Sequence, residues 1–286
     1  MDITNLKIRD MRKLLDSKEI SAAELACSYI DRIEKYDGKL ESYITVTKEK
    51  ALLDAENAQK RIDSGNAPEL CGIPIAVKDN ICTDGIKTTC ASKMLENFIP
   101  PYNATVMEKL YSKGIVLLGK TSMDEFAMGG STQTSAFAKT KNPYDIKKVP
   151  GGSSGGSASC VSASLCAASL GSDTGGSIRQ PASFCGVTGL KPTYGRVSRY
   201  GLIAFASSLD QIGPVAKDAH DCGIILNAIA GYDRHDGTAS KNPTIDYTYA
   251  IGKSMKGVKI ALPKEFYGEG IDREVADAVI AVSYTH

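Results

Sequence analysis

The segment from residue 151 to residue 181 most constrains what this chain can fold into. Two short glycine-serine clusters, residues 151–157 and 171–177, bracket a run of small and apolar side chains. The apolar members of that run have helical spacing: Val161, Leu165, Cys166 and Leu170. A flexible linker would not carry such a pattern. We therefore expect a buried helix of small residues, with the clusters at its ends, where glycine allows tight backbone approach.

Each cluster carries a serine beside backbone N–H groups that a glycine-rich turn leaves free. These serines are Ser153 and Ser177. A hydroxyl fixed near free N–H groups suits nucleophilic catalysis with an oxyanion hole.

Composition narrows the class of protein. The chain has 286 residues and a formal net charge of +1, and Lys147 and Lys148 are its nearest approach to a basic run. A nucleic-acid-binding surface is therefore not indicated. No apolar run is long enough for a membrane span, and the N-terminus is amphipathic rather than a signal peptide. The eight cysteines form no CxxC pair, which favours reduced thiols in a cytoplasmic protein over disulfides or zinc.

Helical and strand patterns alternate along the chain. Helices are expected at residues 4–16, 21–36, 46–63, 103–113, 217–230 and 272–282, and a turn or short helix at 123–131. Strands are expected at residues 72–77, 115–118, 187–190 and 258–262. This alternation implies an α/β fold with a mixed sheet. Ser21 and Glu24 form a capping box at the start of the second helix, and Asp37 with Gly38 is expected to end it.

The C-terminal end is irregular. A helical pattern is under way when the chain reaches residues 283–286, and no strand or cap completes it. We interpret these four residues as a truncation scar. No linker-like break divides residues 1–282, so we expect them to form a single domain that is incomplete at its C-terminus.

Two familiar motifs match this sequence by letter but not by context. Residues 114–121 match the phosphate-binding P-loop, yet their four variable positions are apolar and predict a strand. Residues 151–155 match the GxSxG elbow of α/β-hydrolases, which needs an apolar strand immediately before it. Residues 142–150 cannot be such a strand. Neither a nucleotide site nor a hydrolase elbow is therefore favoured.

A serine-histidine triad also lacks a convincing base. His220 lies at a helix start, His235 in a polar turn and His286 in the irregular tail, so each is better explained as a surface histidine. Lys78 directly follows an apolar strand. Burial there lowers the pKa of a lysine, so that its neutral amine accepts a proton. The competing interpretation is an ordinary lysine whose stem packs on the core.

The second glycine-serine cluster has the better nucleophile geometry. Its N–H groups come from consecutive residues of a glycine-rich turn: Thr174, Gly175, Gly176 and Ser177. Such a turn can bind an anion. Asp173 can hold the turn through hydrogen bonds to its side chain. A phosphate-binding turn or a purely structural turn would show the same pattern.

Lys78, the GGSSGGS cluster and the GSDTGGSIRQPA run together resemble the amidase signature family. The order and spacing of the three motifs are specific, and the resemblance covers residues 5–280. It implies an α/β fold whose mixed sheet is covered by helices on both faces. It also implies a Ser–cis-Ser–Lys triad, with Ser177 as nucleophile, Ser153 as bridging serine and Lys78 as base.

The resemblance assigns roles to the groups around the triad as well. Three N–H groups would form the oxyanion hole: Thr174, Gly175 and Gly176. Ser154 would support the triad within the substrate site, and the backbone around Met128 and Gly129 would line the substrate pocket. No metal ligand is implied.

Three longer motifs are most similar to the glutamine-dependent amidotransferases of that family: residues 119–129, 189–201 and 207–214. This similarity implies a glutaminase subunit that passes ammonia to partner subunits B and C, which amidate Glu-tRNA(Gln). No cofactor is implied for this chain. ATP and Mg²⁺ would be bound by the partner, as would most of the tRNA.

Two other functions stay open at this point. One is a free-standing amidase of the same family that acts on another small amide. The other is an inactive scaffold protein, against which the intact Lys78, Ser153 and Ser177 argue. In this family the groups that grip the α-amino and α-carboxylate ends of glutamine lie largely in the C-terminal part, which we expect to be missing here.

Overall fold

The computed structural model describes residues 2–285. The chain divides into two compact units, residues 1–248 and residues 249–286. The first unit holds the whole sheet and every residue predicted for the active site. The second holds a short 3-10 helix, Lys264–Tyr267, and α8, Arg273–Thr285. The single domain expected over residues 1–282 stays a prediction. Of the expected scar, residues 283–285 continue α8, and His286 lies outside the described residues.

A mixed six-stranded sheet runs through the first unit in the order β1-β3-β2-β4-β6-β5. Its strands are β1 Tyr43–Val46, β2 Pro74–Lys78, β3 Val116–Thr121, β4 Ala168–Asp173, β5 Thr188–Gly189 and β6 Gln211–Ala216. β2 is parallel to both β3 and β4, and the other three pairings are antiparallel. The predicted α/β fold with a mixed sheet is confirmed.

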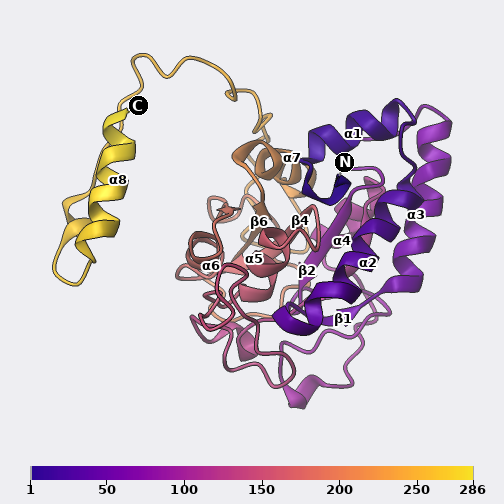
Figure 1. The fold of residues 1–286 in the computed structure, drawn as a ribbon, viewed down its shortest axis with the longest axis horizontal. Helices are drawn as coiled ribbons and strands as arrows, with labels where there is room; N and C mark the ends of the chain where they lie inside the picture. The colour runs from indigo at the N-terminus through magenta and orange to yellow at the C-terminus, as the bar shows by residue number, and fades with distance from the viewer. Residues whose placement is uncertain (1, 286) are drawn as a thin grey trace. The chain divides into compact units, whose positions relative to one another are not determined.

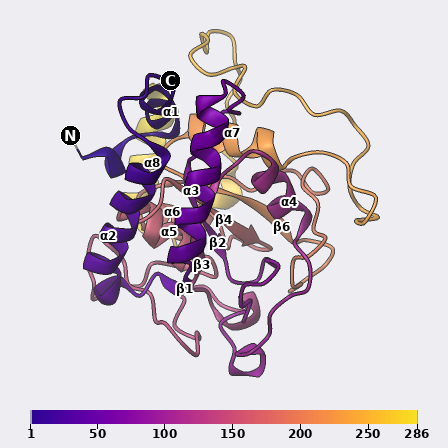
Figure 2. The same ribbon diagram turned by 90° about the vertical axis from the view of Figure 1, so that its right-hand side faces the viewer.

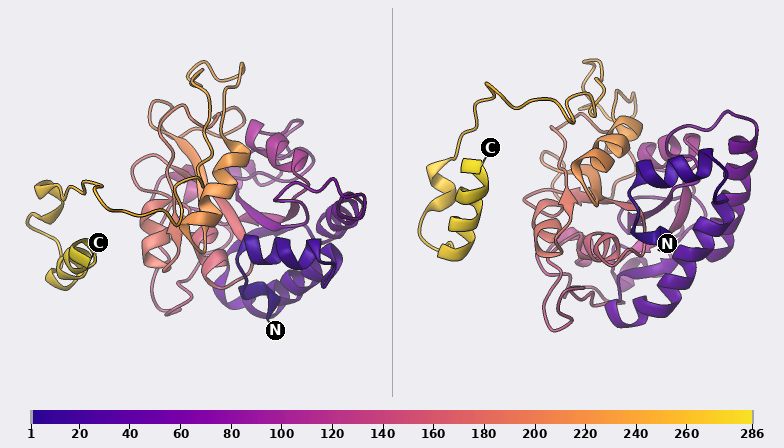
Figure 3. Two further views of the ribbon diagram at one scale, coloured as in Figure 1. Left: turned by 90° about the horizontal axis from the view of Figure 1, so that it is seen from above. Right: turned by 45° about the horizontal axis from the view of Figure 1, so that its top comes forward.

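Seven α-helices surround this sheet in the described part of the first unit, which also holds the 3-10 helices Ile3–Asn5, Lys93–Leu95 and Glu125–Ala127. The α-helices are α1 Ile8–Asp16, α2 Ala22–Leu40, α3 Lys48–Asp63, α4 Thr105–Ser112, α5 Gly155–Ser162, α6 Arg179–Phe184 and α7 Ala219–Ile229. α2 and α3 lie on one side of the central strands and α5 and α6 on the other (Figures 1 and 2). Figure 3 shows the indigo N-terminal helices gathered together, while α7 packs on β6. No described helix is both long and apolar enough to cross a membrane.

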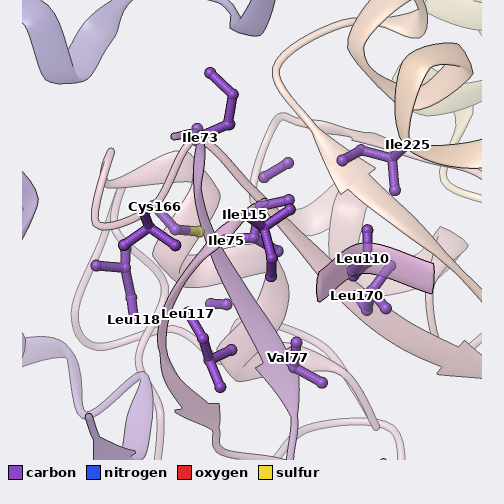
Figure 4. Close-up of a cluster of buried hydrophobic side chains, with 14 of the residues drawn as sticks. Ile73, Ile75, Val77, Leu110, Ile115, Leu117, Leu118, Cys166, Leu170 and Ile225 are labelled. Carbon is purple, nitrogen blue, oxygen red and sulfur yellow. The ribbon is translucent and has the colours of Figure 1, made fainter. Parts of the chain in front are cut away.

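The core lies between β2, β3 and the helices that cover them. Ile75 and Val77 of β2, Leu117 of β3, Leu110 of α4 and Ile225 of α7 are all fully buried in one cluster (Figure 4). Because side chains alternate along a strand, Ile75 and Val77 share one face of β2 and its last residue points to the other. That last residue is Lys78.

The second helix begins as predicted and ends later than predicted. Ser21 and Glu24 form the capping box. The helix continues past Gly38 to Leu40, and Glu41 takes the left-handed conformation that ends it. The Asp37 side chain, expected to stop the helix, instead accepts hydrogen bonds from backbone N–H groups beyond it and so shapes the entry into β1.

Other boundary predictions were wrong because tertiary pairing overrode the local pattern. The helix expected across the centre of residues 151–181 is short: α5 ends at Ser162, and the chain continues as β4. β1 and β6 were not predicted; β6 contains Gly213 and Pro214, which suggest a turn in isolation. The strand expected at residues 258–262 is absent, since that stretch is exposed and irregular.

Candidate active site

Lys78 ends β2 and is fully buried. Its Nζ donates hydrogen bonds to Ser153 Oγ at 2.7 Å and to Ser172 Oγ at 2.9 Å, and it lies 3.3 Å from the Ser172 carbonyl oxygen. Burial lowers the pKa of Lys78 to about 7, and the nearby Asp124 opposes that shift only in part. An amine with this pKa is partly neutral near pH 7, as a general base requires.

Ser172 and Asn80 hold the Lys78 amine in place. Ser172 lies in β4, next to β2 in the sheet, and its Oγ also accepts a hydrogen bond from Asn80 Nδ2 at 3.0 Å. Neither residue was predicted from the sequence. A polar residue two positions after Lys78 was the one available signal for Asn80, and nothing in the sequence pairs Ser172 with a lysine 94 residues away.

Ser153 stands at the start of α5, where glycine is required by close contacts. The Gly152–Ser153 peptide bond is cis, as the resemblance implied. A Cβ on Gly152 would lie 2.1 Å from Asp124 Oδ2. At the second residue of α5, a Cβ on Gly156 would lie 2.5 Å from backbone atoms of Ser122. The small residues of this cluster therefore bring α5 and Ser153 directly against the end of β3.

Ser177 lies in the turn that follows β4, and Asp173 organises that turn. One Asp173 oxygen accepts from the Gly176 N–H at 2.8 Å, and the other accepts from the Ile178 N–H at 3.0 Å. The Arg179 guanidinium binds both oxygens, at 2.9 and 3.0 Å. The pKa of Asp173 falls to about 2 because these hydrogen bonds outweigh its burial. The carboxylate therefore stays charged and holds the turn rigid.

The oxyanion hole expected at Thr174, Gly175 and Gly176 stays a prediction, and one of its three N–H groups already has a partner. The N–H of Gly176 is already donated to Asp173. The N–H groups of Thr174, Gly175 and Ser177 make no hydrogen bond with other described residues, so these three are available to an oxyanion. The Thr174 hydroxyl is bound to Asp210, which fixes that side of the turn.

Ser154 joins the two glycine-serine clusters. Its N–H donates to the Ser177 carbonyl at 3.1 Å, and its hydroxyl donates to the Ser172 carbonyl at 3.1 Å. Ser154 is fully buried. Its predicted support of the triad stays a prediction, and its hydroxyl contacts the β4 backbone at Ser172.

Met128 and Gly129 lie on the surface beside Ser153, because Asp124 holds their segment. The Asp124 N–H donates to the Ser153 carbonyl at 3.2 Å. The buried Asp124 carboxylate accepts from the N–H groups of Ser131 and Thr132 on the far side of the segment. Met128 is 56% exposed. The segment predicted to line the substrate pocket is thus exposed at Met128 and held at Asp124 against Ser153.

The Gln180 side chain connects the segments that contain Gly152 and Gly130, a role that the sequence analysis did not assign to it. Its side-chain oxygen accepts from the Gly152 N–H at 2.8 Å, and its side-chain nitrogen donates to the Gly130 carbonyl at 3.0 Å. Three segments distant in sequence therefore meet at Ser153: the end of β3, the start of α5 and the turn after β4.

The alternatives rejected from the sequence do not reappear at this site. Residues 116–121 of the P-loop match form β3, and Lys120 is buried inside the sheet. His220 contacts Arg9, and His235 pairs with Asp233, so neither contacts Ser153 or Ser177. Among the described residues, no group of three His, Cys, Asp or Glu side chains is placed to hold a metal ion. Lys78, in contrast, contacts the hydroxyls of Ser153 and Ser172.

Comparison with known proteins places this fold and these motifs in a family. Residues 24–283 match the amidase family. The chain belongs to the amidase family. The A subunit of glutamyl-tRNA(Gln) amidotransferase from Ruminiclostridium cellulolyticum is 60% identical over 280 residues, and that from Thermoanaerobacter pseudethanolicus is 56% identical over 279. Each alignment covers 98% of this chain but only 58% and 57% of the relative.

Solved structures of the amidase family share this fold. The A subunit of glutamyl-tRNA(Gln) amidotransferase from Thermotoga maritima matches with a TM-score of 0.85 and 45% identity, covering 96% of this chain and 57% of its own. The peptide amidase of Stenotrophomonas maltophilia matches with a TM-score of 0.80 and 34% identity, covering 85% of this chain and 51% of its own. The chain thus spans a little more than half the length of the relatives it matches.

Proposed function

We propose that this chain carries the glutaminase site of a glutamyl-tRNA(Gln) amidotransferase. The observation that carries the proposal is the contact between Lys78 and Ser153: a fully buried amine lies 2.7 Å from a serine hydroxyl and forms no ion pair with a carboxylate of the described residues. Relatives named as the A subunit of that enzyme, 54–60% identical over nearly the whole chain, support glutamine as the amide.

The first half-reaction forms an ester. The neutral Lys78 amine takes a proton from Ser153, Ser153 takes one from Ser177, and the Ser177 oxygen attacks the side-chain carboxamide carbon of glutamine. The N–H groups left free in the turn, of Thr174, Gly175 and Ser177, stabilise the oxyanion of the tetrahedral intermediate. The proton returns through Ser153 to the amide nitrogen, which leaves as ammonia.

The second half-reaction restores the enzyme. Water attacks the acyl-Ser177 ester while Lys78 accepts a proton through Ser153, and glutamate leaves with Ser177 protonated again. Ammonia released in the first half-reaction passes to partner subunits B and C, where ATP and Mg²⁺ support amidation of Glu-tRNA(Gln). The net charge of +1 is consistent with a protein that leaves most tRNA contact to its partners in the cytoplasm.

Active-serine labelling tests the triad without any substrate. A fluorophosphonate should modify the peptide that contains Ser177, and Ser177→Ala should remove the label. Lys78→Ala should slow labelling by roughly two to four orders of magnitude, the usual contribution of a general base. Labelling of Ser153 instead would reverse the two serine roles.

Ammonia release identifies the substrate. Glutamine, asparagine and a C-terminal peptide amide are compared with the chain alone and with added subunits B and C. Release from glutamine that rises with the partners, together with amidation of Glu-tRNA(Gln), supports the amidotransferase. Equal or faster release from the peptide amide without partners would instead make this a free-standing amidase.

A further inference from the structure

The proposed chemistry leaves one buried lysine unused. Lys120 lies in β3, where it pairs with Val77, the residue before Lys78. It is fully buried. Its Nζ donates to the Ile81 carbonyl and to Thr88 Oγ1, both at 2.8 Å, and lies 3.4 Å from Asp79 Oδ1.

Asp79, the partner of Lys120, fixes the turn at residues 89–91. Its second oxygen accepts from the N–H and the hydroxyl of Thr89, at 2.9 and 2.5 Å. Its backbone carbonyl accepts from the Cys90 N–H at 3.0 Å. Both the side chain and the backbone of Asp79 thus hold the turn against the end of β2.

The turn at residues 89–91 holds the segment that leads to Met128. The Cys90 carbonyl accepts from the Phe126 N–H at 3.0 Å, and the Ala91 carbonyl accepts from the Ala136 N–H at 2.9 Å. Cys90, Ala91, Phe126 and Ala127 all have φ between 50° and 63°. Non-glycine residues adopt this left-handed conformation only where the surroundings enforce it.

We propose that Asp79 and Lys120 are a positioning pair that fixes the substrate-facing backbone at Met128 and Gly129. The inference rests on the proposed function, because it takes that backbone to bind the amide substrate. The pair acts through the turn at 89–91 and through Phe126. It takes no part in proton transfer, since the Lys78 amine is held by Ser153 and Ser172.

This role separates substrate binding from the reactivity of Ser177. Without the pair, residues 125–128 lose their support on the β2 side, while Asp124 still holds residues 131–134 and Ser153. The substrate contact is then loose, and KM rises with little change in kcat. A residue that merely stabilises the fold would lower the apparent kcat and the extent of labelling together as folded protein is lost, and would leave KM unchanged.

The test uses the full chain and three variants: Lys120→Met, Lys120→Arg and the double variant Asp79→Asn with Lys120→Met. The double variant leaves no lone charge buried, so it keeps the test valid where Lys120→Met alone does not fold. Lys109→Met is the matched control, because Lys109 is a partly buried lysine that donates only to carbonyls, those of Ile229 and Ala230.

Hydrogen exchange tests the role of Asp79 and Lys120 without requiring enzymatic activity. Removing the pair should speed exchange of the Phe126 and Ala136 amides by roughly tenfold or more, while amides of the β4–β6 ladder change by less than about twofold. Lys120→Arg and the Lys109→Met control should leave the Phe126 and Ala136 amides close to wild type. A uniform increase across the whole unit, or no increase, would overturn the inference.

Kinetics supplies the second arm. The double variant should raise KM for glutamine by roughly tenfold, with kcat and the rate of Ser177 labelling within about threefold of wild type. Lys120→Arg keeps the charge opposite Asp79, so its KM for glutamine should stay near the wild-type value. A fall in the labelling rate as large as the change in KM would place the pair in the triad and overturn the inference. If the wild-type chain neither labels nor releases ammonia, the proposed function fails, and exchange alone decides whether the pair fixes this segment.

Discussion

Lys78 and Lys120 lie on neighbouring strands, both fully buried, and differ in what faces their amines. Lys78 meets two serine hydroxyls and a carbonyl, whereas Lys120 lies 3.4 Å from the Asp79 carboxylate. Burial lowers the pKa of each, but of the two only Lys120 has a described carboxylate in direct contact. A buried lysine without a counter-ion is suited to accept a proton, and one paired with a carboxylate is suited to hold structure.

The strongest test of this contrast replaces each lysine with arginine. Guanidinium stays protonated and cannot act as a base. Lys78→Arg should therefore slow fluorophosphonate labelling of Ser177 by roughly a thousandfold. Lys120→Arg keeps the charge opposite Asp79 and should stay within about threefold of wild type. Similar losses in both variants would show that the two lysines do not have separate roles.

A second test compares two glycines of the clusters. A Cβ on Gly152 would lie 2.1 Å from Asp124 Oδ2 and 2.6 Å from the Ser131 nitrogen, whereas a Cβ on Gly175 meets nothing within 4 Å. Gly152→Ala should lower the free energy of unfolding by about 1–3 kcal/mol and slow Ser177 labelling. Gly175→Ala should leave stability unchanged or slightly higher. Urea unfolding of both variants measures the difference, and a stable Gly152→Ala would mean that Asp124 is not held as described.

Much of the site follows from the sequence because its signals are local. Lys78 stands out as a lysine directly after an apolar run, and Asp173 with Ser177 as an acidic and a nucleophilic residue in one glycine-rich turn. Each cue lies within a few residues. The contacts between segments are different: Ser172 with Lys78, Gln180 with Gly152, and Asp124 with Ser153 become recognisable only once the sheet order is known.

The errors in the fold have the same origin. Leu170 belongs to a helically spaced apolar set in the sequence, yet it lies in β4, which pairs with β6 along its whole length and with β2 over residues 168–170. β6 contains a glycine and a proline, and still completes that ladder because Pro214 lies opposite Leu170 in a buried strand. At residues 258–262 an apolar run with strand composition has no partner strand in the described structure and forms none. A local sequence pattern predicts a strand correctly only where a neighbouring strand is placed to pair with it.

The pH dependence sharpens the contrast further. The pKa of Lys78 is about 7 when folded against an ordinary 10.5, so between these values the unfolded chain binds a proton that the folded chain does not. Stability should therefore rise with pH across that window, by up to about 1.4 kcal/mol per pH unit from this group. Lys78→Met should remove that contribution, so its urea midpoint should change less between pH 7 and pH 10 than the wild-type midpoint does.

The same pKa predicts how labelling depends on pH. The Ser177 labelling rate should fall as pH drops below about 7, where the Lys78 amine becomes protonated.

The smallest effect should come from Ser172→Ala, which changes the surroundings of Lys78 without altering any residue of the proposed triad. The Ser172 hydroxyl accepts hydrogen bonds from the Lys78 amine at 2.9 Å and from Asn80 at 3.0 Å. Because a charged amine gains more from that acceptor than a neutral one, its loss should lower the Lys78 pKa further. The pH midpoint of Ser177 labelling should then shift down by about half a unit, equivalent to a fraction of one hydrogen bond. The plateau rate should stay near wild type, since Ser153 still contacts the amine.

Ser169→Ala is the matched control for Ser172→Ala. Ser169 lies in the same strand, but its hydroxyl donates to the Ser157 carbonyl rather than contacting Lys78, so the pH midpoint of labelling should not move. An upward shift in Ser172→Ala would mean that this hydroxyl stabilises the neutral amine, and the contrast with Lys120 would then depend on Ser172 rather than on the missing carboxylate.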